Sequence, residues 1–397
     1  GCDFTSIQDA IDSAIPGDII EVYSGHYAEN VDVNKVLTLK GIDTGAGMPV
    51  VDAGGSGSAI TLSKGGVTIE GFKTINSGSN QAGIYVVSTS SNNQIINNNA
   101  SNNYYGIHLF QSSNNILKDN IAKSNTKYGI YVFYSNGNTL TNNTASLNKE
   151  TGIVIYYSSN FLIDNTANLN DLSGIELSGS NNNLINSIAN SNKQSGIRIS
   201  FNSHNNTLTN NTALNNTYGV WIDSESNVLT GNELALNQYG IYLNYYCNYN
   251  SLTDNTLSDN YYGIYIYGFP SYSHIPRYNV LVDNVITYSQ CGIYLKDSKN
   301  NTIGGNLVKS SIQQGIFLYN SSGNIIYFNQ LFYNANNAWD DGVNQWDNGT
   351  IGNYYSNYDE PAEGCVDTDN NSICDAAYSI PGGSNVDNYP MIIEIPP

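Results

Sequence analysis

Near the carboxyl end of the chain, Asp367, Asp369, Asn371 and Asp375 place four oxygen-bearing side chains close together. Alternating Asp and Asn at this spacing is typical of calcium-binding loops, because Ca²⁺ takes several carboxylate and amide oxygens. The loop is not an EF-hand, since Ser372 stands where a glycine is needed and no Glu occupies the twelfth position. We expect a calcium site here, with a plain acidic turn as the alternative.

The five cysteines supply a second kind of chemistry. Cys365 and Cys374 flank the acidic loop, and we expect them to close it as a disulfide. Cys247 and Cys291 are two repeats apart, and a second disulfide between them is the alternative to two separate thiols. Cys2 is then the odd cysteine, which is free, lipidated or bonded to another chain.

Glu176, Arg198 and Asp223 recur at repeat spacing on a surface that is otherwise aromatic. Two carboxylates and a basic group on one face are the parts that general acid and base catalysis on a sugar requires. These three residues are therefore the catalytic candidates. The alternative is an exposed ion pair between neighbouring repeats, which contributes less than about 1 kcal/mol.

Nine Asn-x-Ser/Thr triplets are acceptor motifs for N-glycosylation. They begin at Asn99, Asn142, Asn205, Asn210, Asn215, Asn300, Asn320, Asn348 and Asn370. A sequence rich in Asn and Thr also produces such triplets by chance, so we expect only some of them to carry glycans.

The composition excludes several classes of partner. Among 397 residues, 14 are Lys or Arg and 33 are Asp or Glu, which gives a net charge of −19. Nucleic acid and anionic membranes both need a basic face, so neither is expected as a partner. No apolar run approaches the roughly 18 residues of a membrane span, and no signal peptide is recognisable. The cysteines and the glycosylation motifs favour an oxidising, extracellular setting.

A short phrase, Gly-Ile/Val-x-hydrophobic, repeats along the chain and defines the elements that position these residues. Its glycines are Gly83, Gly106, Gly129, Gly152, Gly174, Gly196, Gly219, Gly240, Gly263, Gly292 and Gly315, mostly 22 or 23 residues apart. A fixed period of this length indicates stacked structural units. Within each unit, apolar residues alternate over short spans, as expected for strands with one buried face. The pattern predicts a parallel β-helix solenoid.

Two columns of Asn accompany the strands. The first comprises Asn98, Asn120, Asn143, Asn165, Asn211, Asn232, Asn255, Asn284, Asn306 and Asn329, interrupted by Ser187. The second comprises Asn103, Asn125, Asn148, Asn170, Asn192, Asn216, Asn237, Asn260 and Asn334, with Ser289 and Ser311 as substitutes. Identical amides on rungs about 4.8 Å apart can bond to one another. Asn also tolerates the left-handed backbone of tight corners. We interpret both columns as structural.

The two ends of the chain differ from the repeats. Residues 1–40 contain Ile7, Ala10, Ile11 and Ala14 at helical spacing, which predicts a capping helix followed by the first strands. Residues 41–335 form the β-helix repeats, and residues 336–397 form a loop-rich cap that carries the acidic loop. Caps are needed because the strand edges at the ends of a stack otherwise invite aggregation.

The residue x of the repeated phrase points outward, and it is often aromatic. Tyr131, Trp221, Tyr242, Tyr265, Tyr294 and Phe317 belong to this column. Rings repeated at rung spacing suggest a face that sugars stack upon or that another protein covers. The alternative is that tyrosine, a good strand former, stacks along the rungs for structural reasons alone.

The opening "SIQDAIDSAIPGDIIEVYSGHYAENV", the Gly-Ile rungs and the tail "GNYYSNY…DTDNNSICDAAYSI…NVDNYP" resemble NosD-like proteins of the pectin-lyase-like superfamily. The resemblance covers nearly the whole chain and implies an all-β, right-handed, single-stranded parallel β-helix with rungs of about 22 to 23 residues. It also implies carbohydrate binding or sugar hydrolysis. In its richness in Asn, Ser and Tyr, the sequence is similar to archaeal cell-surface proteins of this group. A copper role, as implied for NosD, is not expected, because the four His and two Met are scattered without ligand spacing.

Two functions compete on these grounds. The first is an extracellular structural or adhesive protein of the cell surface, such as an S-layer or sheath component. It would contact copies of itself, other envelope proteins or glycans, with calcium as its only expected cofactor. The alternative is an enzyme acting on acidic polysaccharide, a lyase, epimerase or hydrolase, with its site on the outward sheet face.

Overall fold

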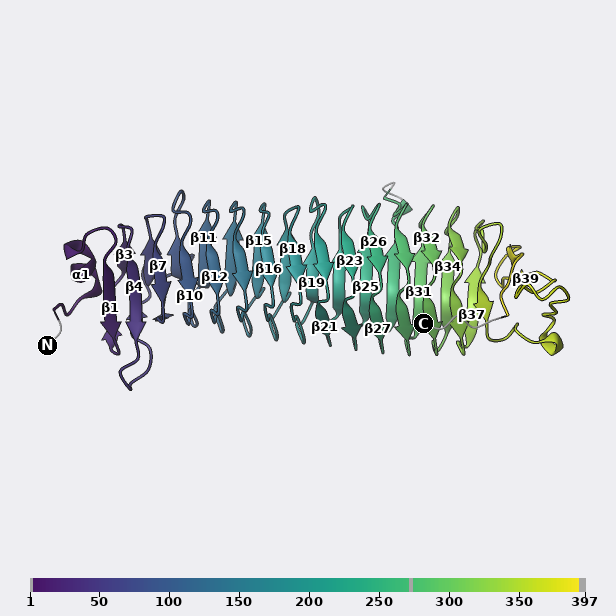
Figure 1. Ribbon diagram of the computed structural model, residues 1–397, viewed down its shortest axis with the longest axis horizontal. Coiled ribbons are helices and arrows are strands. Elements are labelled where there is room, and N and C mark those ends of the chain that lie inside the picture. Colours follow the sequence, from purple (N-terminus) through teal and green to yellow (C-terminus); the bar gives the residue numbers. More distant parts are fainter. Residues whose placement is uncertain (1–2, 271–273, 393–397) are drawn as a thin grey trace. The chain divides into compact units, whose positions relative to one another are not determined.

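The computed structural model describes residues 3–270 and 274–392. These residues form two compact units, residues 1–198 and 199–397, and each unit is described by itself. Both are parallel β-helices, together comprising about 15 turns with rungs of about 23 residues and almost no helix. Successive strands of each unit lie side by side (Figure 1). The all-β solenoid predicted from the sequence is confirmed. Cys2 lies outside the described residues.

The first unit contains three parallel sheets. Sheet A consists of β1 (Ile19–Tyr23), β4 (Thr38–Ile42), β7 (Thr68–Glu70), β10 (Gln94–Ile96), β12 (Ile116–Lys118), β14 (Thr139–Thr141), β16 (Phe161–Ile163) and β18 (Asn183–Ile185). Sheet B consists of β2 (His26–Tyr27), β5 (Val50–Asp52) and β8 (Lys73–Ile75). Sheet C consists of β3 (Val31–Val33), β6 (Ile60–Leu62), β9 (Ala82–Val86), β11 (Tyr105–Phe110), β13 (Ile130–Phe133), β15 (Ile153–Tyr156) and β17 (Ile175–Ser178).

The second unit repeats the same arrangement. Sheet A consists of β20 (Thr207–Thr209), β23 (Val228–Thr230), β26 (Ser251–Thr253), β29 (Val280–Val282), β32 (Thr302–Gly304) and β35 (Ile325–Tyr327). Sheet B consists of β21 (Thr212–Leu214), β24 (Glu233–Ala235), β27 (Thr256–Ser258), β30 (Val285–Thr287), β33 (Leu307–Lys309), β36 (Gln330–Phe332) and β38 (Tyr354–Tyr355). Sheet C consists of β22 (Tyr218–Ile222), β25 (Tyr239–Asn244), β28 (Tyr262–Tyr267), β31 (Cys291–Lys296), β34 (Gln314–Tyr319) and β37 (Asn336–Asp340). Strand β19 (Ser195–Ile199) spans the boundary between the units.

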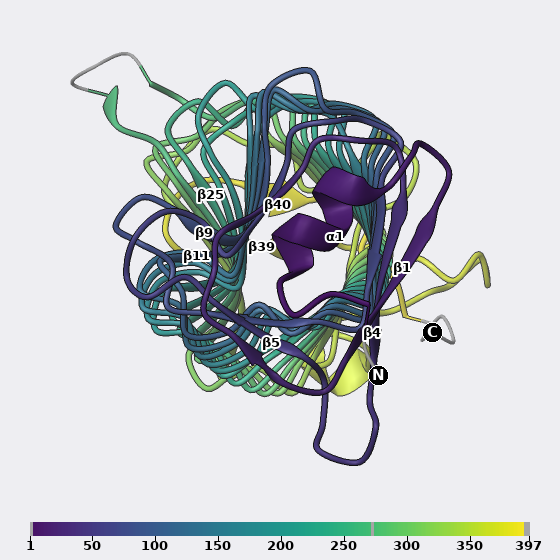
Figure 2. The same cartoon turned by 90° about the vertical axis from the view of Figure 1, so that its left-hand side faces the viewer.

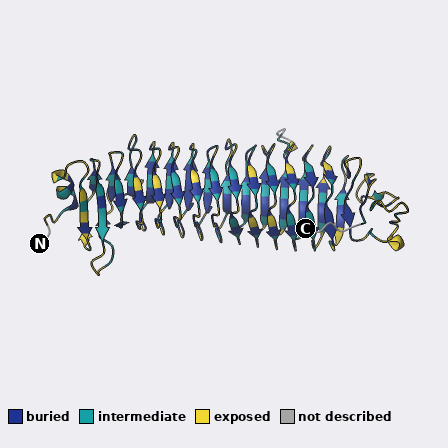
Figure 3. Cartoon of the chain, in the orientation of Figure 1, coloured by how far each residue is buried: buried dark blue, intermediate teal, exposed yellow. Residues whose placement is uncertain are grey.

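The alternation of the repeated phrase produces one buried and one outward side chain in turn (Figure 3). In β13, for example, Ile130 and Val132 are buried, whereas Tyr131 faces outward and is half-buried. The glycine of the phrase is required by close approach, because a Cβ atom on Gly129 would lie 2.7 Å from the carbonyl oxygen of Gly152. The phrase therefore encodes both the core and the tight stacking of neighbouring rungs.

Both predicted Asn columns are hydrogen-bonded ladders. Asn143 is representative, since its backbone N and its Nδ2 each donate to Oδ1 of Asn165 at 3.0 Å. A third ladder was not predicted. In the first unit it comprises Asn93, Asn115, Asn138, Asn160 and Asn182, and in the second unit Asn206, Asn227, Asn250, Asn279, Asn301 and Asn324. Rungs in which all three positions are Asn are therefore fixed by an amide at three corners.

The left-handed backbone expected at the corners lies one residue before nearly every ladder Asn. Asn142 has a φ of 53° and precedes Asn143, while Leu147 has a φ of 60° and precedes Asn148. The ladder amides themselves need an inward-pointing side chain, so the residue that turns the chain is the exposed one before them. The sequence-based assignment of the left-handed conformation to the ladder Asn was therefore displaced by one position.

The predicted helix is α1 (Ile7–Ser13), which begins after the N-cap Ser6 and buries Ile7 and Ile11. Viewed from its end, the first unit has α1 lying across the opening of the coil (Figure 2). Two charged groups fix the helix. The carboxylate of Glu29 accepts hydrogen bonds from the N–H groups of Ile7 and Gln8, and Lys35 Nζ donates to the carbonyl oxygen of Ile11. Charges of these signs at these ends favour the helix dipole.

At the other end, the rungs continue beyond residue 335. Strand β37 pairs with β34, and Trp339 takes the outward position next to Phe317. The cap that follows contains a 3₁₀ turn (Pro361–Glu363) and the antiparallel pair β39 (Tyr378–Ser379) and β40 (Val386–Asp387). Its buried carboxylate Asp387 accepts a hydrogen bond from the backbone N of Asn353 at 2.7 Å. Among the described residues, no helix is long and apolar enough to cross a membrane.

Candidate functional site

The predicted aromatic column of the second unit is continuous over six rungs of sheet C. Its ring centroids are 6.1 Å apart for Trp221 and Tyr242, 5.5 Å for Tyr242 and Tyr265, and 4.8 Å for Tyr265 and Tyr294. Phe317 lies 4.8 Å from Tyr294, and Trp339 lies 4.6 Å from Phe317. All six rings are half-buried. We call this column the aromatic face.

A second row of tyrosines lies against the aromatic face. Tyr218 and Tyr239 stack at 5.0 Å, and Tyr239 and Tyr262 stack at 5.3 Å. Burial is the main cause that raises the pKa of Tyr262 to about 12, and it also raises the pKa values of Tyr242 and Tyr265. The hydroxyl groups are therefore neutral, and the face is apolar with hydrogen-bonding edges.

The first unit has its own aromatic cluster around Tyr131. The Tyr131 ring stacks on His108 at 4.8 Å, and Tyr105 lies 5.2 Å from the same imidazole. Burial lowers the pKa of His108 to about 4, so this ring is neutral and behaves as another flat surface. Phe110 and Phe133 stack beside it at 5.6 Å.

The three catalytic candidates are distributed over both units. Glu176 lies on β17 of the first unit, where Ser178 Oγ donates to its Oε1 at 3.0 Å, and Arg198 lies on β19. Asp223 belongs to the second unit, where its Oδ1 accepts from Trp221 Nε1 at 2.8 Å and from Asn244 Nδ2 at 3.0 Å. Asp223 thus orients the indole that begins the aromatic face.

Exposed bulky residues at left-handed corners form a feature that the sequence analysis missed. Leu147 and Leu169 occupy one corner of neighbouring rungs in the first unit, with φ values of 60° and 57° and exposures of 51% and 54%. In the second unit, Leu236 and Tyr333 occupy the same corner, exposed by 61% and 72%. A left-handed backbone costs about 1–2 kcal/mol for residues other than Gly and Asn. We call these exposed corner side chains, taken separately in each unit, the corner ridge.

The acidic loop brings its carboxylates together. Oxygen atoms of Asp367, Asp369 and Asp375 lie within 4.8 Å of one another, and no other group of three or more His, Cys, Asp or Glu in the described ranges does so. Burial opposes a lower pKa at Asp367, but the backbone N–H groups of Ser372 and Asn371 outweigh it, and the pKa falls below its usual value. Asn371 Oδ1 accepts from the N–H of Ile373 at 2.8 Å. The carboxylate of Asp367 is therefore held in its ionised form by backbone N–H groups of the loop.

The structure confirms the predicted disulfide and decides between the two alternatives for the other cysteines. Cys365 and Cys374 are bonded across the acidic loop. Cys247 and Cys291 are two separate, buried thiols, so the possible disulfide between them is absent. Cys291 opens β31, whereas Cys247 follows the end of β25 and donates to the carbonyl oxygen of Ile222 at 2.8 Å. The two residues thus occupy opposite ends of the sheet C strands.

Eight of the nine glycosylation motifs present an exposed Asn, and Asn99 is half-buried. Several of these side chains stand at left-handed corners, directly before a ladder residue: Asn142, Asn205, Asn210, Asn215 and Asn300. Since the ladder amide next to each is buried, the acceptor and the structural Asn are separate side chains. Glycans at these corners would leave the ladders intact.

The comparisons with known proteins concern both the family and the fold. Residues 50–184 and 150–276 match the family described as "Right handed beta helix region". Residues 271–360 match the family described as "Periplasmic copper-binding protein (NosD)". A cell surface glycoprotein of Methanothermus fervidus is 47% identical over 72 residues, which are 17% of this chain and 12% of that protein. The match therefore spans about an eighth of the length of that relative.

Solved structures share the fold at low sequence identity. The A-module of a mannuronan C-5 epimerase from Azotobacter vinelandii is 15% identical, with a TM-score of 0.59 over 85% of this chain and 94% of that chain. A PL6 family polysaccharide lyase from Pseudopedobacter saltans is also 15% identical, with a TM-score of 0.53 over 72% and 82% of the two chains. The tailspike protein Dettilon is 13% identical, with a TM-score of 0.51 over 76% and 61%.

Proposed function

This chain belongs to the right-handed β-helix family, and from that premise we propose that it is an extracellular structural or adhesive component of a cell surface. The relative that is named a cell surface glycoprotein supports this location. The exposed acceptor Asn residues are consistent with glycosylation, which we include in the proposal. One disulfide in the cap suits an oxidising exterior.

The aromatic face is the observation that carries the proposal. Six half-buried rings at consecutive rungs give a flat, partly apolar stripe with neutral hydroxyl groups, which suits a partner that must be buried against it. The corner ridge supports the same conclusion, because it holds exposed apolar side chains in a backbone conformation that costs energy. We propose that both surfaces contact neighbouring copies of the chain, with glycans as further ligands of the aromatic face.

Calcium is part of the proposed assembly. A chain with a net charge of −19 repels its own copies, and bound cations or salt reduce that repulsion. We propose that Asp367, Asp369, Asn371 and Asp375 contribute to a calcium site, for which the three neighbouring carboxylates and the lowered pKa of Asp367 are the support. The amide oxygen of Asn371 accepts one hydrogen bond, from the N–H of Ile373, and its second lone pair is the one that calcium would take.

Sedimentation of the purified chain tests the assembly. We expect association with added calcium and high salt, and we expect Tyr265→Ser and Leu236→Asn to weaken it at least tenfold. Tyr389→Ser serves as the matched control, because it removes an exposed tyrosine of the cap outside both surfaces. A chain that stays monomeric under all these conditions, and whose Tyr265→Ser variant keeps all glycan binding, would contradict the proposal.

A polysaccharide-active enzyme is the second candidate, favoured by one observation in the first unit. Glu150 and Glu176 lie near enough to Tyr128 to add to the effect of burial, the largest cause, in raising the pKa of its hydroxyl. A phenol held neutral beside two carboxylates is a plausible set of proton donors and acceptors. Incubation with a panel of uronates, followed at 235 nm and by reducing-end assays, tests this. Activity that survives in both Glu176→Gln and Arg198→Ala would exclude these candidates.

A further inference from the structure

The first unit starts with three strands, one in each sheet. The outer edges of β3 and β1 differ in whether another part of the chain covers them. Strand β3 is covered by helix α1, because the side-chain amide of Gln8 stands in for a neighbouring strand. Gln8 Oε1 accepts from the backbone N of Asp32 at 2.8 Å, and Gln8 Nε2 donates to the carbonyl oxygen of Asp32 at 3.3 Å. The edge of β3 is therefore closed.

None of the described residues covers strand β1 in this way. It is the first strand of sheet A, and β4 is its one strand partner among the residues that the structure describes. The carbonyl oxygen of Asp18 bonds to β4 through the N–H of Thr38, and the N–H of Ser24 donates to the carbonyl oxygen of Ile42. Because backbone groups alternate in direction along a parallel strand, the even-numbered residues face β4.

It follows that Ile19, Glu21 and Tyr23 turn their backbone N–H and C=O groups toward the open side. The carbonyl oxygen of Tyr23 accepts from the hydroxyl of Tyr27 at 2.9 Å. The remaining edge groups, on Ile19 and Glu21, are available to another strand. Exposed edges of this kind are templates for added strands.

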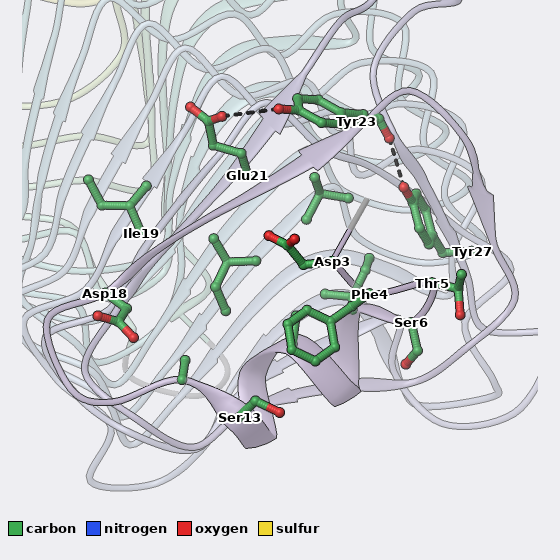
Figure 4. Close-up of a pocket in the computed structure, with 15 residues that line it drawn as sticks. Asp3, Phe4, Thr5, Ser6, Ser13, Asp18, Ile19, Glu21, Tyr23 and Tyr27 are labelled. Atoms are coloured by element: carbon green, nitrogen blue, oxygen red, sulfur yellow. Dashed lines mark hydrogen bonds between the residues drawn. The ribbon is translucent and has the colours of Figure 1, made fainter. Parts of the chain in front are cut away.

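A groove of about 680 Å³ runs beside this edge, between β1 and α1 (Figure 4). Its lining is mixed, with Phe4, Ala10 and Val22 among the apolar residues. Asp3, Asp18 and Glu21 supply its charge, and none of its fifteen lining residues is Lys, Arg or His. The groove thus combines an unpaired backbone edge, apolar lining residues and an acidic rim.

We propose that the β1 edge binds an extended segment of a partner protein in which apolar and basic side chains alternate. Residues opposite Ile20 and Val22 would point into the groove and must be apolar, whereas the residue opposite Glu21 would share its outer face and must be Lys or Arg. A second copy of this chain fits poorly, because its net charge of −19 opposes an acidic rim. The groove is separate from the aromatic face and from the corner ridge.

The probe is a fluorescent peptide with the core Lys-Val-Lys-Val-Lys, flanked by Thr, and its binding is followed by anisotropy. We expect binding that weakens at least tenfold in Glu21→Lys and that returns when the peptide carries Glu in place of Lys. Glu21 is exposed, so this exchange does not disturb the core. Circular dichroism checks that each variant is folded.

A second pair of variants tests the backbone edge itself. Ile19→Pro removes an N–H that faces the open side and leaves the pairing with β4 intact, since proline is tolerated at the first residue of a strand. We expect it to weaken binding at least tenfold, and the control Ile19→Thr, which keeps the N–H, to change binding less than threefold.

Four results would overturn the proposal. The first is absence of binding to the wild-type chain at millimolar peptide, and the second is equal binding to Ile19→Pro and to Ile19→Thr. The third is a concentration-dependent dimer of the chain alone that Ile19→Pro abolishes, which would identify the occupant as a second copy. An N-methylated peptide that binds as well as the parent would likewise show that charge attraction alone is responsible.

Discussion

Replacing Asn143 by Ala tests whether the Asn ladders hold the rungs together. Oδ1 of Asn143 accepts from the N and Nδ2 of Asn120 at 3.1 and 3.0 Å, and its Nδ2 donates to the carbonyl oxygen of Leu117 at 2.9 Å. Asn120 Nδ2 keeps a bond to the carbonyl oxygen of Ile95 in the variant. The N–H of Asn120 is therefore left without a partner, whereas the C=O of Leu117 loses one of two bonds, because the register of β12 and β14 also gives it the N–H of Thr141.

A buried polar group without a partner costs about 1–3 kcal/mol, so the Asn143→Ala variant should lose about 1–3 kcal/mol of stability. Asn143→Ser should lose about half as much, because Ser187 occupies the equivalent place and its Oγ accepts from the N of Asn165 at 3.2 Å. The neighbouring exposed residue provides the control: Asn142→Gly keeps the left-handed corner and should change stability by less than about 0.5 kcal/mol.

Urea unfolding followed by circular dichroism gives the free energies, and hydrogen exchange read by mass spectrometry locates the change. Since repeat proteins open locally, the loss of protection should centre on the rungs that contain Leu117 and Asn143. A loss below about 1 kcal/mol in Asn143→Ala, or an equal loss in Asn142→Gly, would show that the ladder amide does not stabilise the stack.

Three further outcomes concern the cap and the buried thiols. Calcium at 100 times its dissociation constant should stabilise the chain by about 2.7 kcal/mol, which is measured as a gain in melting temperature. This gain should vanish in the double variant Asp367→Asn, Asp369→Asn. If calcium does not raise the melting temperature of the wild-type chain, the proposed site is contradicted. Burial raises the pKa of Asp387 to about 6, so the folded cap favours the protonated form of this side chain. The free energy of unfolding should therefore be highest below about pH 4 and should fall by about 3 kcal/mol as the pH rises through 6. Calorimetry of the wild type and of Asp387→Asn, which should lack this step, measures it, and a melting temperature that stays flat from pH 4 to 7 opposes the assignment. Cys247 and Cys291 should resist alkylation by iodoacetamide until the chain unfolds, because burial raises the pKa of both thiols. Rapid labelling of either cysteine in the native protein, detected by mass spectrometry, would contradict this prediction.

The fold could be predicted from the sequence because the rungs repeat the same short sequence pattern. The Gly-Ile phrase sets the period, and the alternation around Ile130 and Val132 sets the inward face. The end of the coil was harder to locate, since Ala338 and Trp339 replace the usual phrase while keeping its inward and outward directions. The left-handed residue was also ambiguous, because many corners contain two consecutive Asn. Leu147 before Asn148 shows which one turns the chain.

The sites could be predicted from the sequence only where a short local pattern or a single repeated position determines them. The aromatic face follows from the register of a single strand position, and the disulfide of the acidic loop follows from its short span. Cys247 and Cys291 show the opposite case, because sequence separation reveals their rungs but not their corners. The side chain of Gln8 takes the place of a neighbouring strand beside Asp32, and this depends on a tertiary contact that no local sequence pattern encodes.

The Asn ladders also have an electrical direction. Along each ladder of the second unit the amide nitrogen donates to the next rung, so the amide dipoles are aligned with their positive ends toward the carboxyl end. The ladder through Asn329 and Asn353 terminates on the buried carboxylate of Asp387, and the ladder through Asn324 and Asn344 terminates on that of Asp340. A negative group at the positive end is the counterpart of an acidic residue at a helix N-terminus. The two ends of such a stack are therefore not interchangeable. Rungs can be added within it, but its last amide ends on an acidic side chain.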